Sequence, residues 1–143
     1  MESIGKITTL EELDEILSLI DKFHNENDYW KLFTKIGFLT DIVGNLINPD
    51  WSFWIIKNND DKTIGYCIVM IVTKHFIREA VIFDTYMIEN NPELSHKSFE
   101  IIEKWAKDLN CKYISCYTVR GEAISKSYGF NIKQEYLLKK IGG

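Results

Sequence analysis

The sequence predicts an α/β fold, in which a mixed sheet of six to seven strands is flanked by helices in the order β-α-α-β-β-β-α-β-α-β. Two observations carry this prediction. Apolar residues recur at helical spacing over the first fifty residues, whereas from Trp51 onward short apolar runs of strand length alternate with helical stretches. The 143 residues contain no repeat, low-complexity tract or Pro/Gly-rich linker, so we expect a single domain spanning residues 1–143.

The N-terminal part is predicted to form one short strand and two helices. Ser3–Ile7 is the strand, and Thr9 then starts a helix as its N-cap residue, with Glu12 at the position that completes a capping box. The apolar stripe of this helix consists of Leu10, Leu13, Leu17, Ile20 and Phe23. A second helical stretch runs from Trp30 to Leu46 and is followed by the turn residues Asn-Pro-Asp.

Three strands follow with short connections. WSFWIIKN and TIGYCIVMIVTK flank the turn NNDDK, which predicts an antiparallel hairpin, and EAVIFDTYMIE is the third strand. The second arm of the hairpin is almost continuously apolar. Such a run is typical of a central strand covered on both faces, so we expect helices on both sides of the sheet.

The region from residue 79 to residue 119 has a strand–helix–strand pattern. Its helix is expected from Pro92 to Leu109, and its second strand reads CKYISCYTV. The expected inner face of the helix consists of Phe99, Ile102, Ala106 and Leu109. Such a unit forms a right-handed parallel crossover within one sheet. A short helix over GEAISKSYGF and a final strand over NIKQEYLLKKI complete the predicted order.

Composition and charge exclude several classes of function. The net charge of −4 and the pI of about 5.4 argue against a nucleic-acid partner, which requires basic surfaces. No apolar run reaches membrane length, and the start MESIGKITTLEELDE has no signal-peptide pattern. We therefore expect a cytoplasmic protein without a membrane partner.

The cysteines and histidines predict no metal site. Cys67, Cys111 and Cys116 lack metal-ligand spacing, and an odd number of cysteines in a core-rich chain favours reduced, buried thiols. The three histidines are scattered along the chain and form no ligand pair.

The junction IENNPELSHKSF, at the end of the third strand and the start of the long helix, is a candidate binding site. A strand that leads into a helix N-terminus often holds a phosphate, because free backbone N–H groups and the helix dipole point there. Glycines usually let the ligand approach the backbone. This chain has no glycine between Gly65 and Gly121.

Three phrases in this order resemble the GNAT superfamily of acyl-CoA-dependent N-acyltransferases. They are DKTIGYCIV, EIIEKWAKDLNCKYISCYTV and ISKSYGF, and the resemblance is strongest from Lys62 to Ile141. It implies a GNAT-like fold and an N-acetyltransferase that transfers an acetyl group from acetyl-CoA to an amine or to a lysine-bearing acceptor.

The resemblance also assigns the residues that would bind acetyl-CoA. Strand amides for the pantetheine arm would come from Tyr86, Met87 and Ile88, and contacts to the pyrophosphate would come from Ser95, His96, Lys97 and Ser98. The glycines of the family's pyrophosphate loop are replaced, by Glu93 and Ser95 in one alignment or by Leu94 and His96 in another. The resemblance therefore implies a divergent member that lacks the glycine-rich loop.

Four residues are candidates for catalysis. Asp84 lies in an apolar strand, and a carboxylate in such surroundings suits a base that accepts the proton of the amine. The alternative is a structural carboxylate paired with the backbone or with a neighbouring lysine. Glu79 lies in the region where some family members place a base, or it is a solvated strand-end charge. The family's general acid is commonly a tyrosine; Ser125 occupies that position here, and Tyr128 follows one helical turn later.

The segment FHNENDYW would cover the acceptor site in the resembling family. Its acidic and aromatic residues suit a cationic amine, and the candidate residues are Glu26, Asp28, Tyr29 and Trp30. The alternative is a polar loop between two helices, with the two aromatic residues in the core.

Two functions follow from the sequence. The first is the GNAT-like N-acetyltransferase with acetyl-CoA. The alternative is a non-catalytic GNAT-fold interaction module that has lost acetyl-CoA binding and has a protein partner instead. The compact size and the composition rich in Lys, Ile and Asn resemble bacteriophage-encoded chains, which would make such a module virion-associated.

Overall fold

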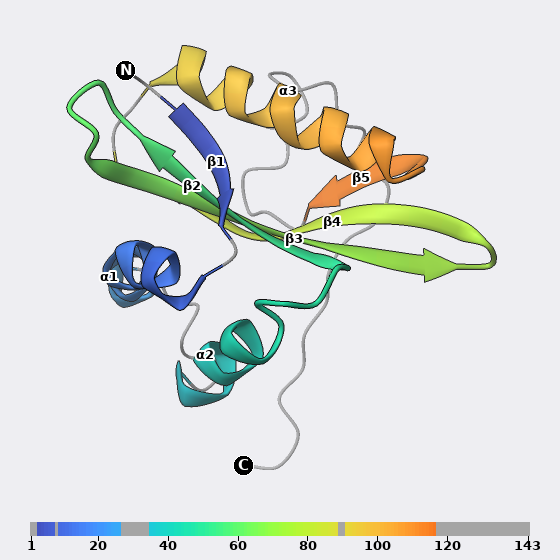
Figure 1. Cartoon of the computed structure of the whole chain (residues 1–143), viewed down its shortest axis with the longest axis horizontal. Helices are drawn as coiled ribbons and strands as arrows, with labels where there is room; N and C mark the ends of the chain where they lie inside the picture. The colour runs from blue at the N-terminus through green and yellow to red at the C-terminus, as the bar shows by residue number, and fades with distance from the viewer. Residues whose placement is uncertain (1–2, 8, 27–34, 89–90, 117–143) are drawn as a thin grey trace.

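The computed structural model describes residues 3–7, 9–26, 35–88 and 91–116. Within them lies one five-stranded sheet whose strands are neighbours in chain order (Figure 1). The strands are β1 (Ser3–Ile7), β2 (Trp51–Lys57), β3 (Thr63–Lys74), β4 (Ile77–Met87) and β5 (Tyr113–Cys116). The helices are α1 (Leu10–Glu26), α2 (Lys35–Gly44) and α3 (Pro92–Asp108).

The sheet is mixed, as the sequence predicts. The first four strands pair antiparallel, and β5 pairs parallel with β4 after the crossover through α3. This confirms the predicted α/β fold class. The helix expected over residues 121–130 and the strand expected over residues 131–141 lie outside the described residues. No helix in the described part of the chain is long and apolar enough to cross a membrane.

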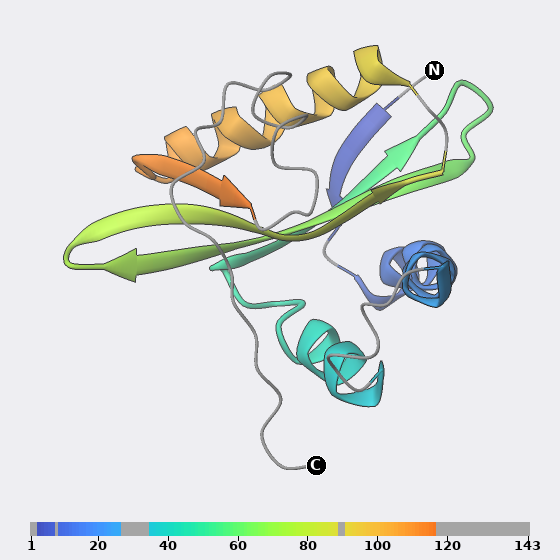
Figure 2. The ribbon, with the colours of Figure 1, turned by 180° about the vertical axis from the view of Figure 1, so that it is seen from behind.

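The helices cover both faces of the sheet (Figure 1, Figure 2). α3 lies on one face, and α1 and α2 lie on the other. β3 runs between the two layers, and its residues from Ile64 to Val69 are buried, as its apolar run predicts. The core beneath α1 and α2 includes Leu13, Ile16, Ile20, Ile42, Phe53, Tyr66 and Ile68. The core beneath α3 includes Trp54, Cys67, Val69, Ile71, Ala80, Ile102 and Ala106.

The buried stripe of α3 differs in part from the predicted one. Leu94, Ser98, Ile102 and Ala106 are its buried residues, whereas Phe99 and Leu109 are only half-buried. The observed stripe follows the spacing of four residues that brings side chains onto one line of a helix. Apolar periodicity does not predict a serine at a buried position of this stripe.

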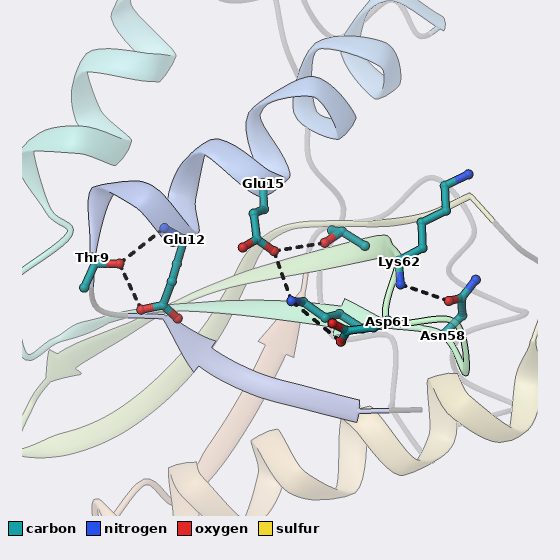
Figure 3. Close-up of polar contacts among 8 residues, drawn as sticks. Thr9, Glu12, Glu15, Asn58, Asp61 and Lys62 are labelled. Atoms are coloured by element: carbon teal, nitrogen blue, oxygen red, sulfur yellow. Dashed lines mark hydrogen bonds and ion pairs between the residues drawn. The ribbon is translucent and has the colours of Figure 1, made fainter. Parts of the chain in front are cut away.

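The start of α1 confirms the predicted cap. Thr9 Oγ1 accepts a hydrogen bond from the Glu12 backbone N–H (3.2 Å) and donates one to the Glu12 carboxylate (3.0 Å) (Figure 3). The side chains of Thr9 and Glu12 therefore bond to each other, and the Thr9 hydroxyl satisfies the Glu12 N–H in the first turn of the helix.

An ion pair joins α1 to the hairpin of β2 and β3 (Figure 3). Lys57 Nζ lies 3.2 Å from Glu15 Oε2, and the same oxygen accepts a hydrogen bond from Thr63 Oγ1 (3.3 Å). Asp61 stands 3.9 Å from the Lys57 ammonium. The hydrogen bond to Glu15 raises the pKa of Lys57, because it favours the charged form of the amine.

The hairpin of β3 and β4 ends in a two-residue turn away from the helices (Figure 1). Lys74 pairs with Ile77, and the two residues between them, His75 and Phe76, have φ of 52° and 67°. Left-handed conformations at both central positions are what a tight hairpin turn of this twist requires, and Asn-Gly is the usual sequence there. The Phe76 side chain is fully exposed.

Candidate functional site

β4 contains a β-bulge that changes which core its side chains join. Val69 lies opposite Ile82, whereas the preceding residue of β3 lies opposite Asp84, so that Phe83 is the extra residue. Ile82 packs in the core beneath α3, but Tyr86, four residues later, packs in the core beneath α1 and α2. In a regular strand residues four apart would share a face. The bulge therefore reverses the facing of β4 at the middle of the sheet.

The hydrogen bonds between β3 and β4 determine which backbone groups of β4 point away from β3. The Ile88 N–H donates to the Ile64 carbonyl oxygen (2.8 Å). In an antiparallel pair, residues bonded to the neighbour alternate with residues whose N–H and C=O point to the other edge. Tyr86, two residues before Ile88, therefore also bonds towards β3. Thr85 and Met87 present their backbone groups towards the β5 edge.

This geometry corrects the prediction of three ligand-binding amides. Of Tyr86, Met87 and Ile88, only Met87 directs its amide towards the β5 edge, and the amide of Thr85 points the same way. The direction of the Thr85 backbone groups follows from the alternation along the strand, which can be assigned only once the register with β3 is known. β5 pairs with β4 over Glu79–Ile82, which precede Thr85 and Met87 on the strand.

The side chains of the three predicted residues serve packing. The half-buried Tyr86 ring lies 6.4 Å from the ring of the fully buried Tyr66. Met87 and Ile88 pack against a small core formed by Ile56, Ile64 and Leu94. A ligand at this part of β4 would therefore meet backbone rather than the side chains of Met87 and Ile88.

The start of α3 uses its own groups to satisfy its first turn. Asn91 Oδ1 accepts a hydrogen bond from the Leu94 N–H (3.1 Å), and the Asn91 carbonyl oxygen accepts one from the Ser95 N–H (3.0 Å). Pro92 has no N–H, and Glu93 supplies a carboxylate in the first turn. A proline at this position and a capping asparagine are favourable for the helix, but they occupy the groups that a phosphate would use.

The four polar residues predicted to contact the pyrophosphate divide into two pairs. The Ser95 hydroxyl donates to the Met87 sulfur (3.7 Å), and the Ser98 side chain is buried on the inner face of α3. Ser98 Oγ has no hydrogen-bond partner in the described part of the chain. His96 and Lys97 are exposed on the same turn. Only the second pair is therefore placed where a ligand in solution would meet its side chains.

The two candidate bases lie five residues apart on β4. Asp84 is opposite Ile68, directly after the bulge, and the structure does not describe its side chain. Glu79 is half-buried between Val72 and Tyr113 on the neighbouring strands. Eight residues of strand separate Glu79 from Met87, about 27 Å at the usual rise per residue. The structure therefore does not bring Glu79 to the start of α3.

The remaining predicted site residues fall beyond what the structure describes. Glu26 ends α1, but its side chain is not among the described ones. Asp28, Tyr29 and Trp30, predicted to contact the acceptor, and Ser125 and Tyr128, predicted to assist the thiolate, lie outside the described residues.

The titratable groups beside this region include two thiols. Burial raises the pKa of the Cys116 thiol, which lies on β5 opposite Ile82, and it also raises the pKa of Cys111, an effect that the Arg78 guanidinium partly offsets. Raised pKa values keep both thiols neutral near pH 7 and make them weak nucleophiles. In the described ranges, no three His, Cys, Asp or Glu residues gather as metal ligands would.

Solved acetyltransferase structures match this chain over nearly its whole length. A predicted acetyltransferase from Clostridium acetobutylicum, with acetyl-CoA, matches at a TM-score of 0.79 and 16% identity, covering 99% of this chain and 97% of that one. The aminoglycoside 6′-N-acetyltransferase AAC(6′)-Ih from Acinetobacter baumannii matches at a TM-score of 0.76 and 14% identity, covering 99% and 100%. AAC(6′)-Iy, in complex with the bisubstrate analogue CoA-S-monomethyl-acetylneamine, matches at 0.76 and 10% identity, covering 100% and 99%.

Sequence comparison is less informative than structure. No family model matches the chain, and no curated protein sequence matches it. Identities of 10–16% to the three structures show that the fold is shared, while activity depends on the site itself.

Proposed function

We propose that this chain, which has the fold of the GNAT N-acyltransferases, transfers an acetyl group from a thioester donor of the acetyl-CoA type to an amine. The observation that carries the proposal is the match over 99% of the chain to a predicted acetyltransferase with acetyl-CoA, at a TM-score of 0.79. Two aminoglycoside acetyltransferases match almost as well, which supports an amine as the acceptor.

In this proposal, backbone N–H groups of β4 bind the thioester. Thr85 and Met87, which face the β5 edge, offer N–H groups that the sheet holds in fixed positions. Fixed donors stabilise negative charge that develops on a thioester carbonyl oxygen without having to reorganise. The donor supplies the activated acetyl group, and the strand supplies its alignment with the amine.

Asp84 is the better of the two candidate bases in this proposal. It follows the bulge on the same part of β4 as Thr85 and Met87, whereas Glu79 is about 27 Å of strand away from Met87. Asp84 would accept the proton of the amine through water. Ser125 or Tyr128 would assist the departing thiolate, as the family resemblance implies.

The acceptor class in this proposal is a cationic amine. The acidic and aromatic residues proposed to recognise it are Glu26, Asp28, Tyr29 and Trp30. A polyamine, an aminoglycoside or a lysine side chain would all present the positive charge that two carboxylates favour.

The test is acetyl transfer by the purified chain. Acetyl-CoA is supplied with spermidine, neamine or a lysine peptide, and the product is detected by mass spectrometry together with the released thiol. Asp84→Asn should lower kcat/KM by about 10²–10⁴-fold, the usual range for a general base. Asp60→Asn, in the exposed turn between β2 and β3, is the matched control and should leave kcat/KM unchanged.

Binding gives an independent readout of the same proposal. A donor at about a thousand times its Kd raises the free energy of unfolding by about 4 kcal/mol. If millimolar acetyl-CoA neither raises the melting temperature nor supports acetylation of any amine, and S-acetylpantetheine fails in the same two assays, the proposed function is wrong.

A second candidate is the non-catalytic interaction module. The observation in its favour is the tip of the β3–β4 hairpin, where Phe76 is fully exposed and Ile77 is 38% exposed. An exposed aromatic side chain on a projecting turn suits an anchor in a pocket of a protein partner. This candidate gains support only if no acyl thioester binds.

A further inference from the structure

The first turn of α3 has few groups left for a phosphate. A helix start normally offers its first four N–H groups to an anion. Here Pro92 has none, the Leu94 N–H is bonded to the Asn91 side chain, and the Ser95 N–H that follows is bonded to the Asn91 carbonyl. Within the described residues, these contacts leave the backbone N–H of Glu93 unused in this turn.

The charge of the same turn opposes a diphosphate. Glu93 is exposed and occupies the position where a negative charge interacts favourably with the helix dipole. A diphosphate would compete for that dipole and would be repelled by the carboxylate. The exposed Lys97, one turn later, offsets this repulsion only in part, since exposed charges are screened by solvent.

The helix start has no room to retreat from the sheet. Leu94 is 1% exposed and packs with Ile56 and Ile64, and the neighbouring Ser95 hydroxyl is bonded to the Met87 sulfur. A diphosphate therefore cannot gain space by a shift of α3 without opening this small core. Side chains stand at every position where a glycine would have let the ligand approach the backbone.

Among the described residues, no strand pairs with the β5 edge of β4 beyond Ile82. The backbone groups of Thr85 and Met87 point towards the β5 edge, where an extended amide-containing arm can pair with a strand. The two halves of a CoA-type donor thus meet different surfaces: its pantetheine arm meets strand backbone, and its diphosphate meets a capped, acidic helix start.

We propose that this chain selects its acyl donor through the pantetheine arm and the thioester, and that the nucleotide diphosphate of CoA contributes little to binding. The inference rests on the proposed acyltransferase function. The substrate class is S-acyl-pantetheine thioesters, whose source is either free CoA or a shorter phosphopantetheine carrier without the nucleotide.

The test compares three donors with one amine acceptor: acetyl-CoA, S-acetyl-4′-phosphopantetheine and S-acetylpantetheine. Their kcat/KM values should agree within about fivefold, which is less than 1 kcal/mol of binding free energy. Adenosine 3′,5′-bisphosphate should neither inhibit nor raise the melting temperature, whereas pantetheine should do both. A preference for acetyl-CoA of about 100-fold or more, or competitive inhibition by the bisphosphate, would overturn the inference and leave the acyltransferase function standing.

A charge variant tests the cause. Glu93→Gln should improve kcat/KM for acetyl-CoA by about two- to fivefold, the range expected for one exposed charge, and should not change it for S-acetylpantetheine. Glu100→Gln, two turns further along the exposed side of α3, is the matched control and should change neither value. Equal effects of Glu93→Gln on both donors would contradict the inference. If none of the three donors binds or reacts, both the inference and the proposed function are wrong.

Discussion

Gly65 of β3 lies so close to β4 that a methyl group on its Cα would stand 2.7 Å from the carbonyl oxygen of Tyr86. Gly65 is paired with Met87 at one of the close, non-hydrogen-bonded positions of the antiparallel ladder. No left-handed φ requires this glycine, so the close approach alone accounts for it. Gly65 thereby holds in place the part of β4 that carries Thr85 and Met87.

We predict that Gly65→Ala destabilises the chain by about 1–3 kcal/mol, as overpacking of a closed core does. The obstacle is backbone, which cannot rotate away as a side chain can. Gly5→Ala in β1 is the matched control, because nothing lies within 4 Å of its added methyl group. Urea denaturation measures both. If both variants change the free energy of unfolding equally, the close approach to β4 does not account for Gly65.

The turn at the tip of the β3–β4 hairpin offers a stabilising change. His75 and Phe76 both have positive φ, which is unfavourable for residues with a Cβ, and the Phe76 side chain makes little packing contact. The double variant His75→Asn, Phe76→Gly should raise the free energy of unfolding by about 1 kcal/mol.

Phe76→Ala separates backbone from side chain in that experiment. It removes the ring but keeps a Cβ in the left-handed region, so stability should change by less than about 0.5 kcal/mol. Thermal unfolding of the three proteins gives the comparison. A gain from Phe76→Ala as large as that of the double variant would show that the exposed ring, not the backbone, was unfavourable.

Two buried serines should respond differently to replacement by alanine. Ser98 Oγ has no hydrogen-bond partner in the described residues, so Ser98→Ala should be neutral or stabilising by up to about 1 kcal/mol. Ser52 Oγ accepts a hydrogen bond from Trp54 Nε1 (2.9 Å), so Ser52→Ala should destabilise by about 1–3 kcal/mol. Chemical denaturation measures both.

Ser98→Ala also tests the predicted role of Ser98 in binding the donor. Because the residue is 4% exposed on the inner face of α3, the variant should bind acetyl-CoA and S-acetylpantetheine as the unchanged chain does. A loss of donor affinity without a loss of stability would instead restore Ser98 to the binding residues.

The pair of Lys57 and Glu15 predicts a change in stability at alkaline pH. The pKa of Lys57 is raised in the folded state, so its contribution is complete below the ordinary lysine pKa of about 10.4 and is lost as pH rises through the folded-state value. The pair is partly exposed, so we expect roughly 0.5 kcal/mol.

Glu15→Gln should remove this contribution at neutral pH, and the difference in stability between the two proteins should shrink as the pH rises through the raised pKa of Lys57. Denaturant midpoints at pH 7, 9 and 11 provide the measurement. A difference between the two proteins that grows as the pH rises would contradict the sign of the shift.

Much of the fold can be predicted from the sequence. The cap of α1 depends on Thr9 and Glu12, which lie three residues apart, and their contact is the predicted one. The burial of β3 on both faces follows from its apolar run, and the parallel pairing of β5 follows from the strand–helix–strand pattern. These features depend on neighbours in the chain or on periodicity, so composition along the sequence is sufficient to predict them.

The candidate site was predicted less well. Tyr86 and Ile88 were expected to offer free amides, yet the Ile88 N–H bonds to the Ile64 carbonyl oxygen and Tyr86 shares its orientation. The amide of Thr85 faces the β5 edge as that of Met87 does, and no pattern within the strand indicates this. The extra residue Phe83 has no sequence signature, because the bulge is defined only by the partner strand.

The sequence by itself determined the order of the elements, the central position of β3, the cap of α1 and the absence of glycine from the start of α3. The tertiary structure decided which backbone groups of β4 point away from β3, which serine of α3 is buried without a hydrogen-bond partner among the described residues, and why Gly65 must be a glycine. The physical reason is register. A shift of one residue between two strands exchanges both their faces and the direction of their hydrogen bonds, and the bulge that shifts β4 against β3 is defined only by their pairing.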